Sequence, residues 1–273
     1  FPVDFAMDKN DNSTSNWDQC ARLIQGMYIQ STSSNPEGAM ASLGAFDSNA
    51  GWQRASYDSN WYSWMWKRHA GFEVVTYTGD SSAGRPVYHN LNKVPEMIWV
   101  KNRGYSQNWK VYHMGLNEGT TPQYYSLELD SSNAEVDDHQ FWNDTAPNST
   151  YVTLGTSTEC NYDGANIIMM LFASVPGISK CGYYTGNGTV GHEITGLGFQ
   201  PRFIIIKRTN GTAPWVVLDT KRGWGSGDDR MIYINQTASA TVYEYGAPIA
   251  DGFRLDWTGT YGNSNGDKFI YYA

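Results

Sequence analysis

The feature that most constrains the fold of this chain is a long pattern that occurs more than once. It begins with a Tyr-Thr-Gly turn, continues to a proline that opens a short apolar run ending in a basic residue, and closes with a tryptophan-led segment. The fullest copies start at Tyr77 and Tyr184 and contain Pro95 and Pro201. Their spacing of roughly 100 residues is the size of a small β-sandwich. Such internal repetition points to an architecture before any single residue does.

A partial third copy opens the chain. Residues 5–9, 97–101 and 203–207 are corresponding apolar runs, and Trp17, Trp109 and Trp215 follow them in the same order. This correspondence predicts three units, at residues 1–70, 71–177 and 178–273, of which the first lacks the Tyr-Thr-Gly entry strand. Because the first copy begins inside the pattern and the last strand ends before the pattern would, we expect the chain to be a fragment of a longer protein.

Local patterning predicts an all-β protein made of tandem antiparallel β-sandwich units. Residues 97–100 and 203–206 are apolar at consecutive positions, which indicates strands buried on both faces. Residues 61–66, with the sequence WYSWMW, stand where the other units have residues 166–172 and 268–272, and are predicted to close the first unit. No stretch of ten residues has a helical period, although residues 17–25 could form one or two helical turns.

Charge and cysteine content limit the kinds of partner. The net charge is −8, whereas binding to duplex DNA or to an anionic membrane requires clustered basic residues. No apolar run reaches the length of about 20 residues that spans a bilayer. We therefore expect neither nucleic-acid binding nor membrane insertion. Cys20, Cys160 and Cys181 have no metal-binding spacing and are expected to be buried thiols. A disulfide between Cys160 and Cys181 is the alternative.

Aromatic residues beside turns are the candidates for ligand binding. Trp142, Trp224 and Trp257 lie outside the repeated strands and next to turn residues. An exposed indole offers a flat apolar face on which a sugar ring can lie. Nearby charged groups, here Arg222 and Asp229, can hydrogen-bond to sugar hydroxyls. The alternative is that these rings cover the ends of the sandwiches. The repeated Trp17, Trp109 and Trp215 are predicted to be core residues.

Metal and catalytic motifs are weak in this sequence. Asp137 and His139 could share a metal site only if their segment is extended, because alternate residues of a strand face the same side. A solvated turn is the favoured interpretation. Residues 8–12 resemble the start of a calcium loop but lack its Gly and Glu. The sequence contains no GxSxG or HExxH motif and no Cys/His signature. We therefore expect no cofactor and no enzymatic activity.

The combined motifs resemble a repeat of proteins associated with the tails and fibres of tailed phages, especially marine ones. These motifs are YTGNG, the run GFQPRFIIIKR, and a tryptophan followed by Asp and Arg-Gly. Residues 184–223 match most fully. Residues 71–115 depart at Asp80, which replaces Asn187, and have no Asp or Arg-Gly after Trp109. In the first copy Asp18 directly follows Trp17, and Arg22 has no Gly after it.

This resemblance implies a structural component of a virion appendage, such as a tail fibre or spike, at the virion surface or outside the cell. It further implies self-association, as a homotrimer or another symmetric oligomer, and contact with other virion proteins. It carries no catalytic residues to this chain. Adhesion to a host-surface glycan through the loops is the corollary, since appendages gain affinity by multivalency. The alternatives are a secreted carbohydrate-binding module and a fragment of a polysaccharide depolymerase, for which no particular carboxylate pair stands out.

Overall fold

A computed structural model describes residues 1–40, 46–53 and 59–273, and it confirms the all-β prediction. Residues 41–45 and 54–58, inside the predicted first unit, lie outside the described residues. We use unit 1, unit 2 and unit 3 as labels for residues 1–70, 71–177 and 178–273. The boundaries of these units and the threefold sequence repeat stay predictions.

Each unit contains sheets of its own, and their pairings are antiparallel. Unit 1 has one sheet, formed by β1 (Phe5–Asn10), β2 (Asp18–Ala21), β3 (Met27–Gln30), β4 (Gly38–Ala39) and β5 (Trp61–Trp66). The large sheet of unit 2 is formed by β6 (Phe72–Thr78), β8 (Met97–Asn102), β9 (Lys110–His113), β10 (Tyr125–Glu128), β11 (Val136–Asp137) and β13 (Asn166–Phe172), and its small sheet by β7 (Arg85–Tyr88) and β12 (Tyr151–Leu154). The large sheet of unit 3 is formed by β14 (Cys181–Thr185), β16 (Phe203–Arg208), β17 (Val216–Asp219), β18 (Asp229–Tyr233), β19 (Thr241–Tyr243) and β22 (Lys268–Tyr272), and its small sheet by β15 (His192–Thr195), β20 (Gly246–Ile249) and β21 (Gly252–Leu255).

The three large sheets follow one strand order. In unit 2 the order is β6-β13-β8-β9-β10-β11, and in unit 3 it is β14-β22-β16-β17-β18-β19. The sheet of unit 1 runs β5-β1-β2-β3-β4, which corresponds to the last five places of the other two. Among the described residues, no strand of unit 1 occupies the place of β6 and β14. The segment 61–66 is a strand as predicted, and it lies at the edge of its sheet.

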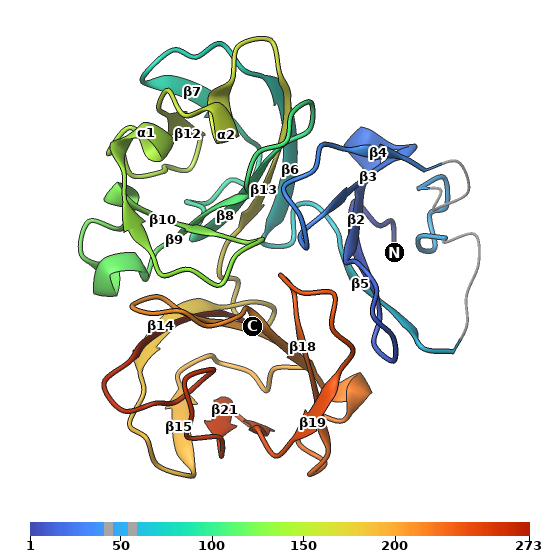
Figure 1. Cartoon of the computed structure of the whole chain (residues 1–273), viewed down its shortest axis with the longest axis vertical. Helices are drawn as coiled ribbons and strands as arrows, with labels where there is room; N and C mark the ends of the chain where they lie inside the picture. The colour runs from blue at the N-terminus through green and yellow to red at the C-terminus, as the bar shows by residue number, and fades with distance from the viewer. Residues whose placement is uncertain (41–45, 54–58) are drawn as a thin grey trace.

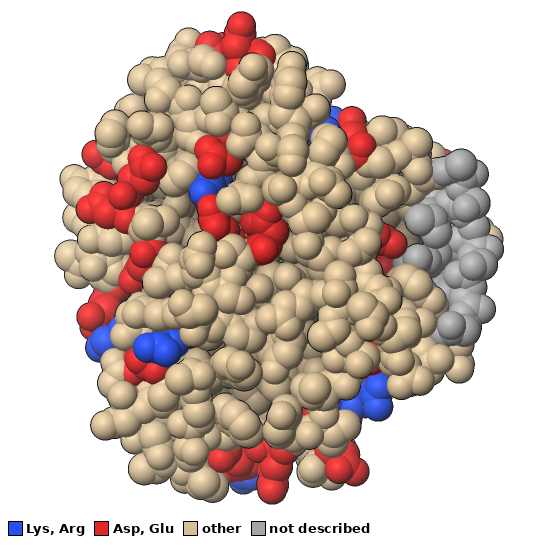
Figure 2. All heavy atoms as spheres, in the orientation of Figure 1, with Lys and Arg blue, Asp and Glu red and all other residues tan. Residues whose placement is uncertain are grey.

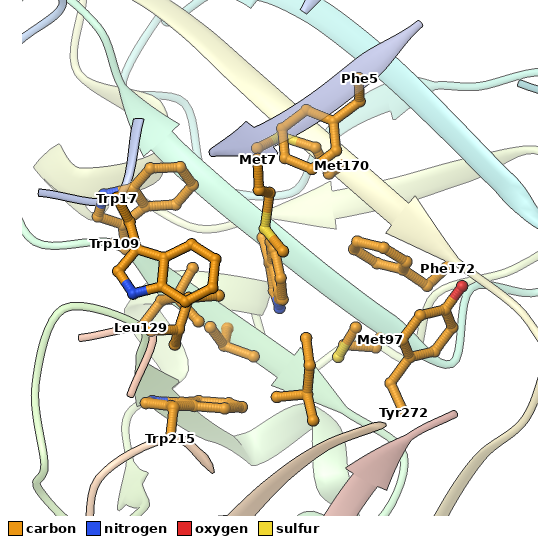
Figure 3. Packing of buried hydrophobic residues seen from close by; sticks show 14 of the residues in the cluster. Phe5, Met7, Trp17, Met97, Trp109, Leu129, Met170, Phe172, Trp215 and Tyr272 are labelled. Atoms are coloured by element: carbon orange, nitrogen blue, oxygen red, sulfur yellow. The ribbon is translucent and has the colours of Figure 1, made fainter. Parts of the chain in front are cut away.

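The three large sheets pack around one shared hydrophobic core, so the units are not arranged as separate domains in a row. Figure 1 shows unit 2 at the top, unit 3 at the bottom and unit 1 at the right of a common centre. The central cluster draws buried residues from every unit, among them Met7, Trp99 and Ile205. In Figure 3, Trp17, Trp109 and Trp215 lie at one side of this cluster, and Phe172 and Tyr272 at the other. The tryptophans are buried core residues, as the sequence predicts.

Each of these three tryptophans ties its unit to a neighbouring one. Trp17 Nε1 donates to the backbone oxygen of Tyr233 at 2.8 Å. Trp109 Nε1 donates to that of Gln30 at 2.9 Å, and Trp215 Nε1 to that of Glu128 at 2.9 Å. Unit 1 therefore bonds to unit 3, unit 3 to unit 2, and unit 2 to unit 1. We call the three contacts seams; together they close a ring.

The lysines that end the apolar runs reinforce the same seams. The ammonium of Lys9 donates to the backbone oxygen of Thr237, that of Lys101 to Ser34, and that of Lys207 to Ser132. All three lysines are buried, and burial lowers their pKa values, to about 8, 8 and 7 respectively. A buried ammonium needs such acceptors, because an unpaired buried charge is costly.

Smaller elements lie at the sheet ends. Residues 17–25, for which helical turns were an option, form strand β2 and the short 3₁₀ helix η1 (Arg22–Ile24). The described α-helices are single turns, α1 (His139–Trp142) and α2 (Thr158–Asn161). Cys20, Cys160 and Cys181 are buried thiols that form no disulfide, so the alternative of a disulfide between Cys160 and Cys181 is wrong. Burial raises the pKa of Cys160 to about 12, which makes this thiol unreactive at neutral pH.

Candidate functional site

Two of the three candidate tryptophans are buried. Trp142 lies on α1, and its Nε1 donates to the backbone oxygen of Tyr125 at 3.1 Å. Trp224 packs in the outer core of unit 3, between the large and small sheets. Their exposed fractions are 1% and 4%. The expectation that these rings stand open to solvent does not hold, because both fill space beneath the small sheets and their loops, the capping role that the sequence also allowed.

Trp257 differs, since its ring is only partly buried and has an aromatic partner at the surface. Tyr243 lies edge-on to it, with the ring centroids 5.0 Å apart, and Tyr243 is 41% exposed. The carboxylate of Asp256, the residue before Trp257, forms an ion pair with Arg254 at 2.8 Å. Aromatic rings bind the face of a sugar ring, and charged donors and acceptors bind its hydroxyls.

Asp229 and Arg222 are held inside the protein by structural contacts. The carboxylate of Asp229 accepts hydrogen bonds from the backbone nitrogens of Gly225, Tyr245 and Gly246, at 2.7 to 3.0 Å. The guanidinium of Arg222 pairs with Asp219 at 2.6 Å and lies over the ring of Trp64, 5.2 Å from its centroid. Both side chains are buried. The ligand-binding role of the five candidates stays a prediction, and only Trp257 lies where a ligand could reach a ring.

The weak metal candidates Asp137 and His139 lie on different elements. Asp137 ends β11, whereas His139 begins α1, with Asp138 between them capping the helix through a 2.8 Å bond to the Gln140 nitrogen. The segment is therefore not extended across both residues. Among the residues that the structure describes, no three His, Cys, Asp or Glu side chains are grouped to hold a metal ion. The first residues of the calcium-like stretch 8–12 lie within β1.

The Tyr-Thr-Gly motif makes a structural clasp whose partners the sequence reading missed. The hydroxyl of Tyr77 donates to the backbone oxygen of Cys160 at 2.7 Å, and that of Tyr184 to Gly262 at 2.6 Å. The next residue along each of these carbonyl-bearing segments is an asparagine, Asn161 or Asn263. Each is buried, and its side-chain oxygen accepts from the backbone nitrogen just after the motif glycine. The one sequence signal for these asparagines is that each lies about 80 residues after its Tyr-Thr-Gly motif.

A groove runs along the open edge of β5, between unit 1 and unit 3, where sequence reasoning placed no site. It has two adjoining stretches, of about 860 and 470 Å³, that share Ser63, Trp64, Arg202 and Phe203. Its lining includes the strand itself with the residue after it, and residues 199–203 and 219–221 of unit 3. The larger stretch is also lined by Phe1, Ala70, Gly177, Ile178, Tyr272 and Ala273. Consecutive residues 62–67 line it, which means that the groove follows the strand's edge and not one of its faces.

The floor of the groove is aromatic and well ordered by contacts. Trp64 Nε1 donates to Asp219 at 3.2 Å, and Trp66 Nε1 donates to the Tyr272 hydroxyl at 3.2 Å. The ring of Phe203 lies 5.8 Å from that of Trp66, edge-on. The exposed basic side chains of Lys67, Arg202 and Lys221 stand at its rim. The groove is therefore an apolar channel with a positive border.

His113 is a buried imidazole at the boundary of units 2 and 3. Its Nε2 lies 3.1 Å from the backbone oxygen of Tyr271, and its Nδ1 accepts from the Gly115 nitrogen at 3.0 Å. These partners fix a neutral ring with the proton on Nε2. Burial lowers the pKa of His113 to about 4, so the ring is a structural group and not a base poised near neutral pH.

We expect His113 to make the fold sensitive to mild acid. Its pKa is about 4 in the folded chain and about 6.5 when unfolded, so between these values the unfolded chain binds a proton that the folded chain does not. Stability from this residue is therefore full above pH 6.5 and falls as the pH drops toward 4, by up to roughly 3 kcal/mol. Urea unfolding at pH 7 and pH 4.5 measures the loss. His113→Gln should reduce it, whereas a variant of exposed His139, His139→Gln, should not.

The described residues on the face drawn in Figure 2 form no concentrated basic patch. On the face shown in Figure 2, acidic side chains outnumber basic ones, and both stand in small separate groups. This agrees with the net charge of −8. No helix in the described part of the chain is long and apolar enough to cross a bilayer.

Comparison with known proteins gives a family but no activity. Residues 63–273 match the family model described as "Domain of unknown function (DUF7483)", a match that begins in β5 and covers units 2 and 3. No curated protein and no solved structure matches the chain.

Proposed function

The chain belongs to the DUF7483 family, and from that premise we propose that it is a non-enzymatic adhesion module of a virion appendage, a tail fibre or spike, which binds a host-surface glycan. The pair Tyr243 and Trp257 carries this proposal. It consists of two aromatic rings, partly open to solvent, and the Arg254 and Asp256 ion pair directly precedes Trp257 in the chain. The motif resemblance supports the virion context, a location at the virion surface or outside the cell, and partners among other virion proteins.

The closed ring of seams supports this role on physical grounds. Three sheets around one core hold their connecting loops on a rigid frame, and a rigid frame reduces the entropy lost when a loop binds a ligand. A homotrimer would present three such patches together and multiply a weak affinity for each glycan through effective concentration.

The test is a glycan array probed with the purified chain and with Tyr243→Ala. Tyr243 is exposed at the surface, so its removal should leave the fold intact while weakening glycan binding about tenfold, as expected for the loss of one stacked ring. Tyr105→Ala is the matched control, because Tyr105 is 47% exposed and pairs with the ring of Tyr162. Binding that is unchanged in Tyr243→Ala, or absent in the parent chain, would remove the adhesion proposal.

The same patch would equally serve a secreted carbohydrate-binding module, the second candidate that this geometry favours. Labelling of phage particles with an antibody against the chain distinguishes the two. A particle-bound signal is expected for the virion component, and none for a secreted module.

A further inference from the structure

The open edge of β5 contrasts with the corresponding strands of the other units. β13 is paired on both sides, by β6 and β8, and β22 likewise by β14 and β16. β5 occupies the same place in its sheet, yet within the described residues its one strand partner is β1. The difference appears in burial, since six of the seven residues of β13 are fully buried, whereas every residue of β5 is at least partly exposed.

The groove along this edge has the same surroundings as the positions that β6 and β14 occupy in their sheets. In unit 3, β14 lies beside the turn that follows β9, with Tyr183 packed directly on Gly115. β6 likewise contacts η1, which follows β2. The corresponding turn for unit 1 follows β17, and its residues 219–221 line the groove opposite β5. An added strand would thus lie between an edge and a turn, as β6 and β14 do.

Strand pairing indicates the side chains that such a strand would carry. Phe72 of β6 stands opposite Phe172, and Val74 stands opposite Met170. The places of Phe172 and Met170 are taken in β5 by Trp66 and Trp64, which pair with β1 at the corresponding positions. A large apolar residue opposite Trp66 and a medium one opposite Trp64 would therefore cover the aromatic floor.

We propose that the open edge of β5 binds an extended polypeptide strand of the β6 type, antiparallel to β5, which adds a sixth strand to the sheet of unit 1. Backbone pairing supplies affinity in this mode, and side-chain pockets supply specificity. The basic rim of Lys67, Arg202 and Lys221 selects an acidic strand. This inference does not depend on glycan binding, because the groove and the Tyr243 patch share no residue.

A labelled peptide with the sequence of residues 71–80, GFEVVTYTGD, tests the proposal against the full chain. This segment has the apolar pattern and carries two acidic residues. Fluorescence anisotropy should show saturable binding, and hydrogen exchange should slow at the backbone amides of Ser63 and Met65, which face away from β1. A peptide of the same composition in scrambled order should bind at least tenfold more weakly.

Charge reversal at the basic rim tests whether the peptide binds in this groove. Arg202→Glu with Lys221→Glu should weaken peptide binding about tenfold while leaving the thermal unfolding temperature unchanged, since both side chains are exposed. Lys93→Glu, at an exposed site of unit 2, should leave binding unchanged. Three results would overturn the proposal: no saturable binding, equal binding by the double variant, or a dimer of the chain that excludes the peptide, which would assign the edge to a second copy.

Discussion

Trp109→Ala is expected to lower the free energy of unfolding by roughly 4 kcal/mol or more. Truncation of a buried tryptophan costs about 3 to 5 kcal/mol through lost burial and a residual cavity. Trp109 is 0% exposed in the central cluster. The backbone oxygen of Gln30, its partner across the seam, would lose its indole donor in addition.

Equilibrium denaturation with urea measures this loss, and two further variants separate its causes. Trp109→Phe keeps a buried ring but removes the donor, and should cost about 1 to 2 kcal/mol. Tyr88→Ala removes a side chain that is 64% exposed and should change stability by less than about 0.5 kcal/mol. If Trp109→Ala were as stable as Tyr88→Ala, the shared core would not be what holds the units together.

Gly79→Ala should destabilise the chain by roughly 3 kcal/mol or more. A Cβ atom at this position would lie 1.9 Å from the backbone oxygen of Tyr162. Backbone on both sides must shift to relieve such a contact, which would pull Tyr77 and Asn161 out of the clasp. Gly186→Ala should have a similar effect, because its Cβ would lie 2.3 Å from the Ser264 oxygen.

The thermal unfolding temperature of each glycine variant provides the measurement. Gly104→Ala is the matched control in unit 2, since the nearest atom to an added Cβ is 3.9 Å away, and it should unfold close to the parent temperature. A normal unfolding temperature for Gly79→Ala would mean that the turn has room for a side chain, and the clasp would lose its explanation of the motif glycine.

The sequence predicts the strands of this fold well, because their signals are local. Consecutive apolar residues at 97–100 and 203–206 mark strands that are buried on both faces, and both are found in β8 and β16. The lysines that end these runs are also evident in the sequence, but their structural role is not. Their carbonyl acceptors, such as Thr237 for Lys9, lie in another unit and far along the chain.

The candidate site was harder to predict, for a related reason. Trp142 and Trp224 stand beside turn residues in sequence, which suggests exposure, but only the packing of a whole unit shows that their rings are covered. Trp257 has the same kind of neighbours and remains partly open. The groove beside β5 joins residues 62–67 to residues 199–203 and 219–221, so no local pattern could reveal it.

The ring of seams has a consequence for how proteins of this architecture can change in length. An open stack of repeats tolerates gain or loss of a member, since each touches only its neighbours. Here the last member must meet the first, as Trp17 does at Tyr233. Deleting a unit would leave an indole and a lysine ammonium without their carbonyl acceptors. Inserting a unit would separate the residues that form the seam between the first and last units. Loops of this structure can lengthen without disturbing the seams, whereas geometric closure constrains how many large sheets the ring can hold.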